Sequence, residues 1–130
     1  MRRELGVACE GGARRLHIDP EIIGAVQDAG CELAGVTNGT LEAPVGIDWI
    51  CMSPKAGADL VLKRGQELKL VFPQSGGEPE RYHDLAFENF FLQPMDGPEK
   101  EQNIRLATRY CLAHPEWRLS LQTHKILGIR

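Results

Sequence analysis

The chain has 130 residues, the length of one ordinary domain, and we expect residues 1–130 to form a single unit. Hydrophobic residues make up 42% of it and charged residues 25%, a composition typical of globular rather than disordered proteins. Fifteen Lys and Arg against eighteen Asp and Glu give a net charge of −3, which argues against a dedicated nucleic-acid-binding module because such modules carry a basic excess.

The first residues, Met1–Leu5, carry charge but lead into no apolar run of the kind that a secretory signal needs. No stretch elsewhere approaches the roughly 20 apolar residues of a membrane span. We therefore expect a cytoplasmic protein without membrane association.

Six short apolar segments, each ending in polar residues or in Gly or Pro, are predicted to be strands. They are too short for amphipathic helices and show no helical period. In chain order they are Leu5–Cys9, Cys31–Val36, Ile47–Met52, Glu67–Phe72, Asn89–Leu92 and Trp117–Leu121.

Two helices have recognisable ends. Asp19, Pro20 and Gly30 suit the cap, first position and left-handed stop of a helix over Pro20–Ala29. One side of this helix would carry Ile22, Ile23 and Val26. The second helix is predicted over Pro98–His114, because Glu99 and Glu101 lie in its first turn and Arg109 and His114 near its end, as the helix dipole favours. Its predicted apolar stripe comprises Ile104, Ala107, Cys111 and Leu112.

Strands that alternate with helices indicate an α/β fold with a mainly parallel sheet. Residues 37–46 separate two of the strands and are too few for a parallel crossover helix, which needs a dozen or more residues. Either this strand pair is antiparallel, or the crossover is reduced to a loop.

The four cysteines form no C-x-x-C pair, and we expect them to be buried, reduced thiols rather than ligands of a zinc or iron–sulfur site. They are Cys9, Cys31, Cys51 and Cys111.

Polar residues follow strand after strand, and ligands of parallel α/β sheets bind at the carboxyl ends of the strands. Turns are polar in any protein, however, so the pattern alone leaves both interpretations open. Lys55 suits an anion but also plain solvation, and His124 beside Lys125 suits either a pocket or the surface. Gly11-Gly12 allows close backbone approach to a ligand or forms a simple turn.

Taken together, these pieces resemble the 7-carboxy-7-deazaguanine synthase family, over nearly the whole chain and with high specificity from Thr37 to Arg130. The segments that carry the resemblance are Gly11-Gly12, Thr37–Thr40, Asp48–Gly57, Glu67–Gln74, Phe90–Pro98 and Leu121–Lys125. They correspond to the C-terminal portion of that family only.

The resemblance implies a radical S-adenosylmethionine-type fold, here an incomplete, reduced (β/α) barrel. The family contracts 6-carboxy-5,6,7,8-tetrahydropterin to 7-carboxy-7-deazaguanine with release of ammonia, on the route to queuosine. It is a carbon–nitrogen lyase that uses S-adenosylmethionine, a 4Fe–4S cluster and Mg²⁺, typically as a homodimer. By position, the S-adenosylmethionine contacts would be Gly12, Ser53, Lys55 and Gln93, and the contacts to the pterin substrate would be His124 and the terminal carboxylate on Arg130.

Several departures from the family pattern concern the reaction itself. The three cluster cysteines of the family, and its Mg²⁺ site, lie upstream of anything in this sequence, and without the cluster the carbon–sulfur bond has no route to homolysis. Glu10 replaces a threonine before the two glycines, Ala13-Arg14 replaces Glu-Pro after them, and Val36 replaces a glutamate. Val36 cannot accept a hydrogen bond from ribose hydroxyls.

We therefore expect a truncated or diverged synthase that binds small molecules but is inactive alone. Three alternatives stay open: the cluster-less half of a split enzyme whose partner chain bears the cluster, a non-catalytic nucleotide- or pterin-binding module, and a start codon assigned too late. Loss of a preceding barrel strand would leave Leu5–Cys9 as an open edge, so we also expect a marginally stable or self-associating chain.

Overall fold

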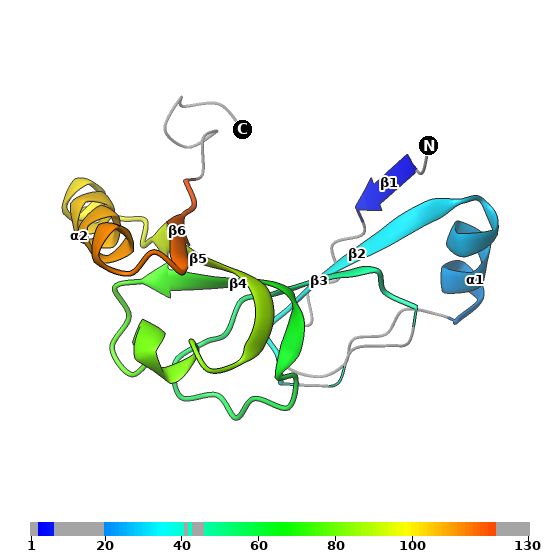
Figure 1. Cartoon of the computed structure of the whole chain (residues 1–130), viewed down its shortest axis with the longest axis horizontal. Coiled ribbons are helices and arrows are strands. Elements are labelled where there is room, and N and C mark those ends of the chain that lie inside the picture. The colour runs from blue at the N-terminus through cyan, green and yellow to red at the C-terminus, as the bar shows by residue number, and fades with distance from the viewer. Residues whose placement is uncertain (1–2, 7–19, 41, 43–45, 122–130) are drawn as a thin grey trace.

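Six parallel strands form one twisted sheet in the computed structural model, which describes residues 3–6, 20–40, 42 and 46–121 (Figure 1). Every strand pairs with the next one along the chain, so the order in the sheet is the order in the sequence. The strands are β1 (Arg3–Gly6), β2 (Cys31–Thr37), β3 (Trp49–Met52), β4 (Arg64–Phe72), β5 (Ala86–Pro94) and β6 (Trp117–Leu119).

The predicted α/β class with a parallel sheet is thus confirmed. Within the described residues β1 pairs only with β2, and β6 pairs only with β5. The sheet is therefore open rather than closed on itself, as an incomplete barrel would be.

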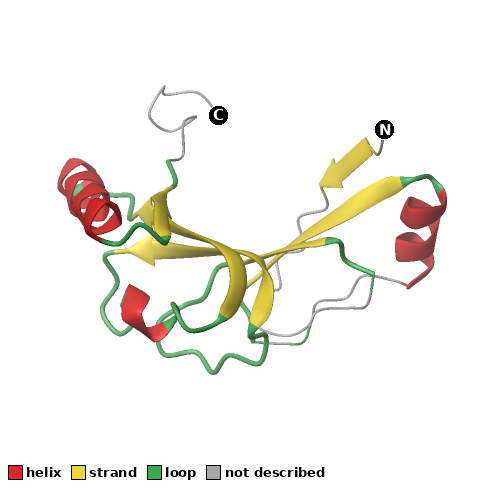
Figure 2. Cartoon of the chain, in the orientation of Figure 1, coloured by secondary structure: helices red, strands yellow, loops and turns green. Residues whose placement is uncertain are grey.

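Two α-helices lie near opposite ends of the sheet (Figures 1 and 2). Helix α1 (Pro20–Asp28) packs against β2, and its chain reverses through Gly30, which has a positive φ of 74°. Helix α2 (Lys100–Ala113) packs against β5 and β6. It begins two residues later than predicted, because Pro98 lies before Glu99, the residue that occupies the N-cap position.

The pairing of β2 with β3 decides between the two alternatives for residues 37–46. Ala34 lies opposite Trp49 and Thr37 opposite Met52, which makes the pair parallel. The crossover is therefore a loop, and its described residues hold no helix. The β4–β5 connection likewise has only a single 3₁₀ turn, η1 (Pro79–Arg81).

The strand bounds differ from the predicted ones for local reasons. β3 starts at Trp49 rather than Ile47, since the Asp48 carboxylate accepts the Leu33 N–H at 2.9 Å and ends the regular ladder there. β6 ends at Leu119 rather than Leu121. β1 starts earlier than predicted, at Arg3, and ends at Gly6, while residues 7–9 of the predicted strand lie outside the described part of the chain.

Apolar side chains on one face of the sheet form the main core. Its fully buried members are Met52, Leu68, Leu70 and Leu92, and Trp117 is 2% exposed. Ala107 of α2 packs on them together with Cys111. A second, smaller cluster joins α1 to β2 through Ile23, Leu33, Val26 and Ile47.

Two predictions about apolar positions were wrong. Leu112 was assigned to the apolar stripe of α2 but is 79% exposed, because it is rotated about 100° from Cys111 and about 140° from Ala107 on the helix. The polar Asn103 is buried instead, and its amide donates to the Met95 carbonyl at 3.0 Å. Cys31, Cys51 and Cys111 are free thiols that are half-buried rather than buried, while Cys9 lies outside the described residues.

Among the described residues, neither α1 nor α2 is long and apolar enough to cross a membrane.

Candidate functional site

The second face of the sheet carries polar and half-exposed side chains, and we call it the open face. Successive residues of a strand point to opposite faces, and residues in register on parallel strands share a face. The register therefore places on the open face Val36 of β2, Trp49 and Cys51 of β3, Glu67 and Lys69 of β4, and Phe91 and Gln93 of β5.

The two faces differ sharply in exposure. Leu68 and Leu70 on the core face are fully buried, whereas Val36 and Trp49 on the open face are 39% and 41% exposed. Strands of a parallel sheet are normally buried on both sides. The open face is thus exposed where a parallel sheet is normally covered, as expected of a surface that a ligand or another chain contacts.

Ser53 lies directly after β3 and is fixed to both neighbouring strands. Its backbone N–H donates to the Thr37 carbonyl at 2.7 Å, and its hydroxyl donates to the Lys69 carbonyl at 3.0 Å. Because the hydroxyl proton is used within the protein, the oxygen remains available as an acceptor. Lys55, two residues later, is exposed.

Gln93 lies near the carboxyl end of β5, half-buried and in register with Val71 of β4. Strands in a sheet are about 4.8 Å apart, so Gln93 and Ser53, with β4 between them, are separated by about 10 Å across the sheet. Ser53, Lys55 and Gln93 are therefore at one edge of the sheet, as the parallel arrangement led us to expect. Their predicted roles as ligand contacts stay predictions.

The turn after β2 is organised by its own polar side chains. The Thr37 hydroxyl accepts the Gly39 N–H at 3.1 Å, and the Asn38 side-chain oxygen accepts both the N–H and the hydroxyl of Thr40 at 3.1 and 2.8 Å. Gly39 has a φ of 82°. This turn holds the end of β2 beside Ser53.

Gln74, which follows β4, has a structural role in the turn. Its amide donates to the Val71 carbonyl at 3.2 Å, and its oxygen accepts the Ala56 N–H. At this position the polar residue after the strand is therefore part of an ordinary turn.

Three sequence-predicted site residues, Gly12, His124 and Arg130, lie outside the described residues. The open face in turn contains charged residues that the sequence analysis did not single out. Glu67 and Lys69 occupy alternate positions in the segment Glu67–Leu70, and this alternation of charged and apolar residues is the pattern that would have revealed them.

Charges on the open face are partly compensated. One Glu67 oxygen accepts the Trp49 indole N–H at 3.2 Å, and the other lies 3.9 Å from the Lys69 ammonium. Burial, and then the Glu67 carboxylate, raise the pKa of Cys51 to about 11. The Cys51 thiol is therefore protonated at neutral pH and is a poor nucleophile and metal ligand in that state.

A separate hollow of about 360 Å³ lies between the loops that follow β3 and β4. It is lined by Gly57, Ala58, Asp59, Leu60, Gly76, Arg81 and Tyr82 and includes none of Ser53, Lys55 and Gln93.

No protein-family model matches the chain. Individual proteins do match it. The 7-carboxy-7-deazaguanine synthase of Caulobacter vibrioides is 56% identical over 123 residues, which cover 95% of this chain and 59% of the relative. Proteins of the same name from Bradyrhizobium diazoefficiens and Bordetella pertussis are 56% and 55% identical, with the same shares covered.

The chain thus spans about 59% of the length of these curated relatives, and the matched part is their C-terminal portion. By sequence, 95% of this chain is thus similar to the C-terminal portion of the 7-carboxy-7-deazaguanine synthases.

Proposed function

We propose that this chain binds S-adenosylmethionine and a carboxylated pterin at the carboxyl ends of its strands, and that it carries out no radical chemistry by itself. The observation that supports this most is the gathering of Ser53, Lys55 and Gln93 at one edge of the sheet, beside a half-exposed face. Binding of this kind would take place in the cytoplasm, in the chemistry that leads to deazaguanine nucleosides such as queuosine.

Each of these three groups has a chemical capacity that suits S-adenosylmethionine. The Ser53 oxygen is free to accept, for example from an ammonium or a ribose hydroxyl. The exposed Lys55 ammonium suits a carboxylate, and the Gln93 amide both donates and accepts, as an adenine edge requires. We further propose that Gly12 lies against the methionine end of this ligand, and that His124 and the Arg130 carboxylate contact the pterin.

The described cysteines do not fit an iron–sulfur cluster. Such clusters are held by several thiolates that converge on one point. Cys31 is at the start of β2, Cys51 lies on the open face with a raised pKa, and Cys111 is on α2 in the main core. No three His, Cys, Asp or Glu side chains in the described part of the chain gather as metal ligands. We therefore assign no reaction step to these residues.

A second candidate is a split synthase, in which a separate chain supplies the cluster, the Mg²⁺ site and the missing strands. The edge of β1, which is unpaired among the described residues, and the open face favour it, since both are surfaces that a parallel α/β protein normally covers. A homodimer would cover the same surfaces without supplying a cluster.

The binding proposal is tested by anaerobic isothermal titration calorimetry of the chain with S-adenosylmethionine and with 6-carboxy-5,6,7,8-tetrahydropterin. We expect heat from at least one of them, and S53A or Q93A to weaken S-adenosylmethionine about tenfold, a typical effect of one lost polar contact. Absence of heat with both ligands would refute the proposal. Turnover only after mixing with a cluster-bearing chain would establish the split enzyme.

A substitution at Val36 is expected to strengthen the binding of S-adenosylmethionine rather than weaken it. It is exposed on the open face, where the family resemblance expects a glutamate that accepts ribose hydroxyls. We expect V36E to tighten S-adenosylmethionine about tenfold, in line with a charge-assisted hydrogen bond. V61E is the matched control, because Val61 is 47% exposed and lies on the loop before β4 rather than on a strand of the sheet. Equal affinities of V36E and V61E would contradict the assignment.

A further inference from the structure

Lys69 shares a layer of the open face with Ser53. The Ser53 hydroxyl donates to the Lys69 carbonyl at 3.0 Å, so the two residues are direct cross-strand neighbours. A ligand atom that rests on the Ser53 oxygen would thus be about one strand spacing, 4.8 Å, from the backbone of Lys69. The four-carbon stem of a lysine spans such a distance easily.

The side chain of Lys69 is held on the open face without being fully paired. It is 31% exposed, and its ion-pair partner among the described residues, Glu67, is 21% exposed. The separation of 3.9 Å between the ammonium and the Glu67 oxygen exceeds the 2.7–2.9 Å of a charge-assisted hydrogen bond. Protons of the ammonium therefore remain available to a second acceptor.

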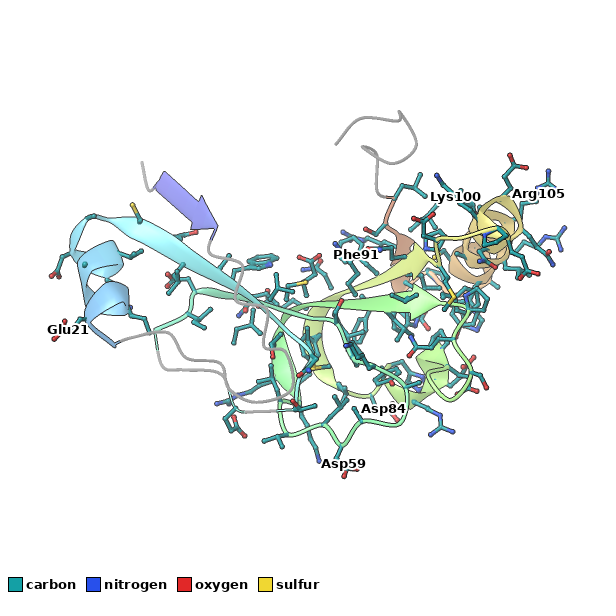
Figure 3. The ribbon with its side chains drawn as sticks, turned by 180° about the vertical axis from the view of Figure 1, so that it is seen from behind. Glu21, Asp59, Asp84, Phe91, Lys100 and Arg105 are labelled. Atoms are coloured by element: carbon teal, nitrogen blue, oxygen red, sulfur yellow. The ribbon has the colours of Figure 1, made fainter. Side chains whose placement is uncertain are left out.

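Glu67 is fixed from its other side by the Trp49 indole, whose N–H donates to the second carboxylate oxygen at 3.2 Å. Phe91, labelled in Figure 3, is the register partner of Lys69 on β5 and is half-buried. Lys69 thus has an aromatic residue, Phe91, beside it on β5 and Ser53 beside it at the end of β3. This is a setting in which a carboxylate of a small ligand finds both an opposite charge and an apolar contact.

We propose that Lys69 binds a carboxylate of the small molecule that also contacts Ser53. The inference rests on the proposed function and adds to it a second cation, besides Lys55, that recognises a negative charge of the ligand. Two ligands of that function carry a carboxylate: the methionine end of S-adenosylmethionine and the acid group of the pterin.

The test compares ligands with and without the carboxylate by titration calorimetry. S-adenosylmethionine is paired with its decarboxylated form, and 6-carboxy-5,6,7,8-tetrahydropterin with tetrahydropterin. We expect K69M to weaken one carboxylate ligand about tenfold, which equals about 1.4 kcal/mol, and to leave its carboxylate-free counterpart unchanged. The pair that responds identifies the source of the carboxylate.

Two further variants make the outcome decisive. K63M removes the same charge from an exposed lysine in the loop before β4 and should leave all four affinities unchanged. K69R keeps a cation and should retain most of the affinity for the carboxylate ligand. If K69M does not fold, as judged by circular dichroism, K69Q replaces it.

Equal effects of K69M on both members of each pair, or no effect at all, would overturn the role of Lys69 while the wild-type heats uphold the proposed function. If the wild-type chain binds none of the ligands, the proposed function and the role of Lys69 both fall.

Discussion

The two tryptophans of the chain occupy opposite environments. Trp117 on β6 is 2% exposed and packs on Phe90 with ring centroids 5.1 Å apart, whereas Trp49 on the open face is 41% exposed. The Trp117 indole nitrogen is buried and has no hydrogen-bond partner among the described residues. Trp117 therefore contributes to stability through apolar packing.

We expect W117A to lower the free energy of unfolding by about 3–5 kcal/mol, the usual cost of truncating a buried aromatic side chain. W49A should lower it by less than about 1 kcal/mol, since exposed positions contribute little. Urea denaturation followed by circular dichroism measures both. Similar losses in the two variants would show that the open face is covered in solution.

Cys51 should resist alkylation. Because burial and then Glu67 raise its pKa from 9.0 to about 11, the thiolate fraction at pH 8 falls about a hundredfold. We expect iodoacetamide to modify Cys31 before Cys51 at pH 8, and Cys51 reactivity to rise steeply as the pH approaches 11. Peptide mass spectrometry of the native chain gives the order. In 8 M urea, used as the unfolded control, the two should react alike.

Among the elements, the turn that directly follows β2 depends on a single glycine, Gly39. Gly39 has a positive φ, and a Cβ at this position would collide with Met52 and approach Leu60. Gly57 also has a positive φ, of 78°, but a Cβ there would meet nothing within 4 Å. The pair separates backbone strain from steric conflict.

G57A should cost about 1–2 kcal/mol, the penalty of a left-handed conformation for a residue with a side chain. G39A bears the same penalty and must also displace Met52 from the main core, so we expect it to cost at least about 2 kcal/mol more. Thermal and urea unfolding of both variants test this. Equal losses would mean that Met52 moves aside freely.

The sequence predicted the type of every α-helix and strand in the described residues, because caps, prolines and short apolar runs are local features. It underestimated β4 and β5, whose first three residues, Arg64–Gln66 and Ala86–Glu88, form no continuous apolar run and are instead ordered by backbone pairing with each other. Pairing between distant segments leaves little trace in local composition.

The candidate site, too, was predictable only where it depends on local features of the sequence. Ser53, Lys55 and Gln93 could be placed at one edge because the carboxyl ends of parallel strands coincide. Lys69 and Glu67 could not be assigned to the open face until the register between β3, β4 and β5 was known. The side on which a helix packs decides which alternate residues stay exposed.

For the molecule as a whole, we expect the free edge of β1 to promote association. In the described residues β1 pairs on one side only, and unpaired strand edges recruit other chains. We expect the weight-average mass in sedimentation experiments to exceed that of a monomer and to rise with concentration. A monomer at all concentrations with a cooperative thermal transition would contradict this.

The two hydrophobic clusters share no buried residue, and this separation has a consequence for dynamics. The cluster of Ile23 and Leu33 holds α1 to β2, while the main core lies around β4 and β5. Regions with few buried contacts open independently of the global transition. Native-state amide hydrogen exchange should therefore divide the chain into two foldons, with Leu33 exchanging well before Leu70. A ligand that bridges Ser53 and Gln93 would slow amide exchange in the foldon of the main core and leave exchange in the foldon of α1 and β2 unchanged.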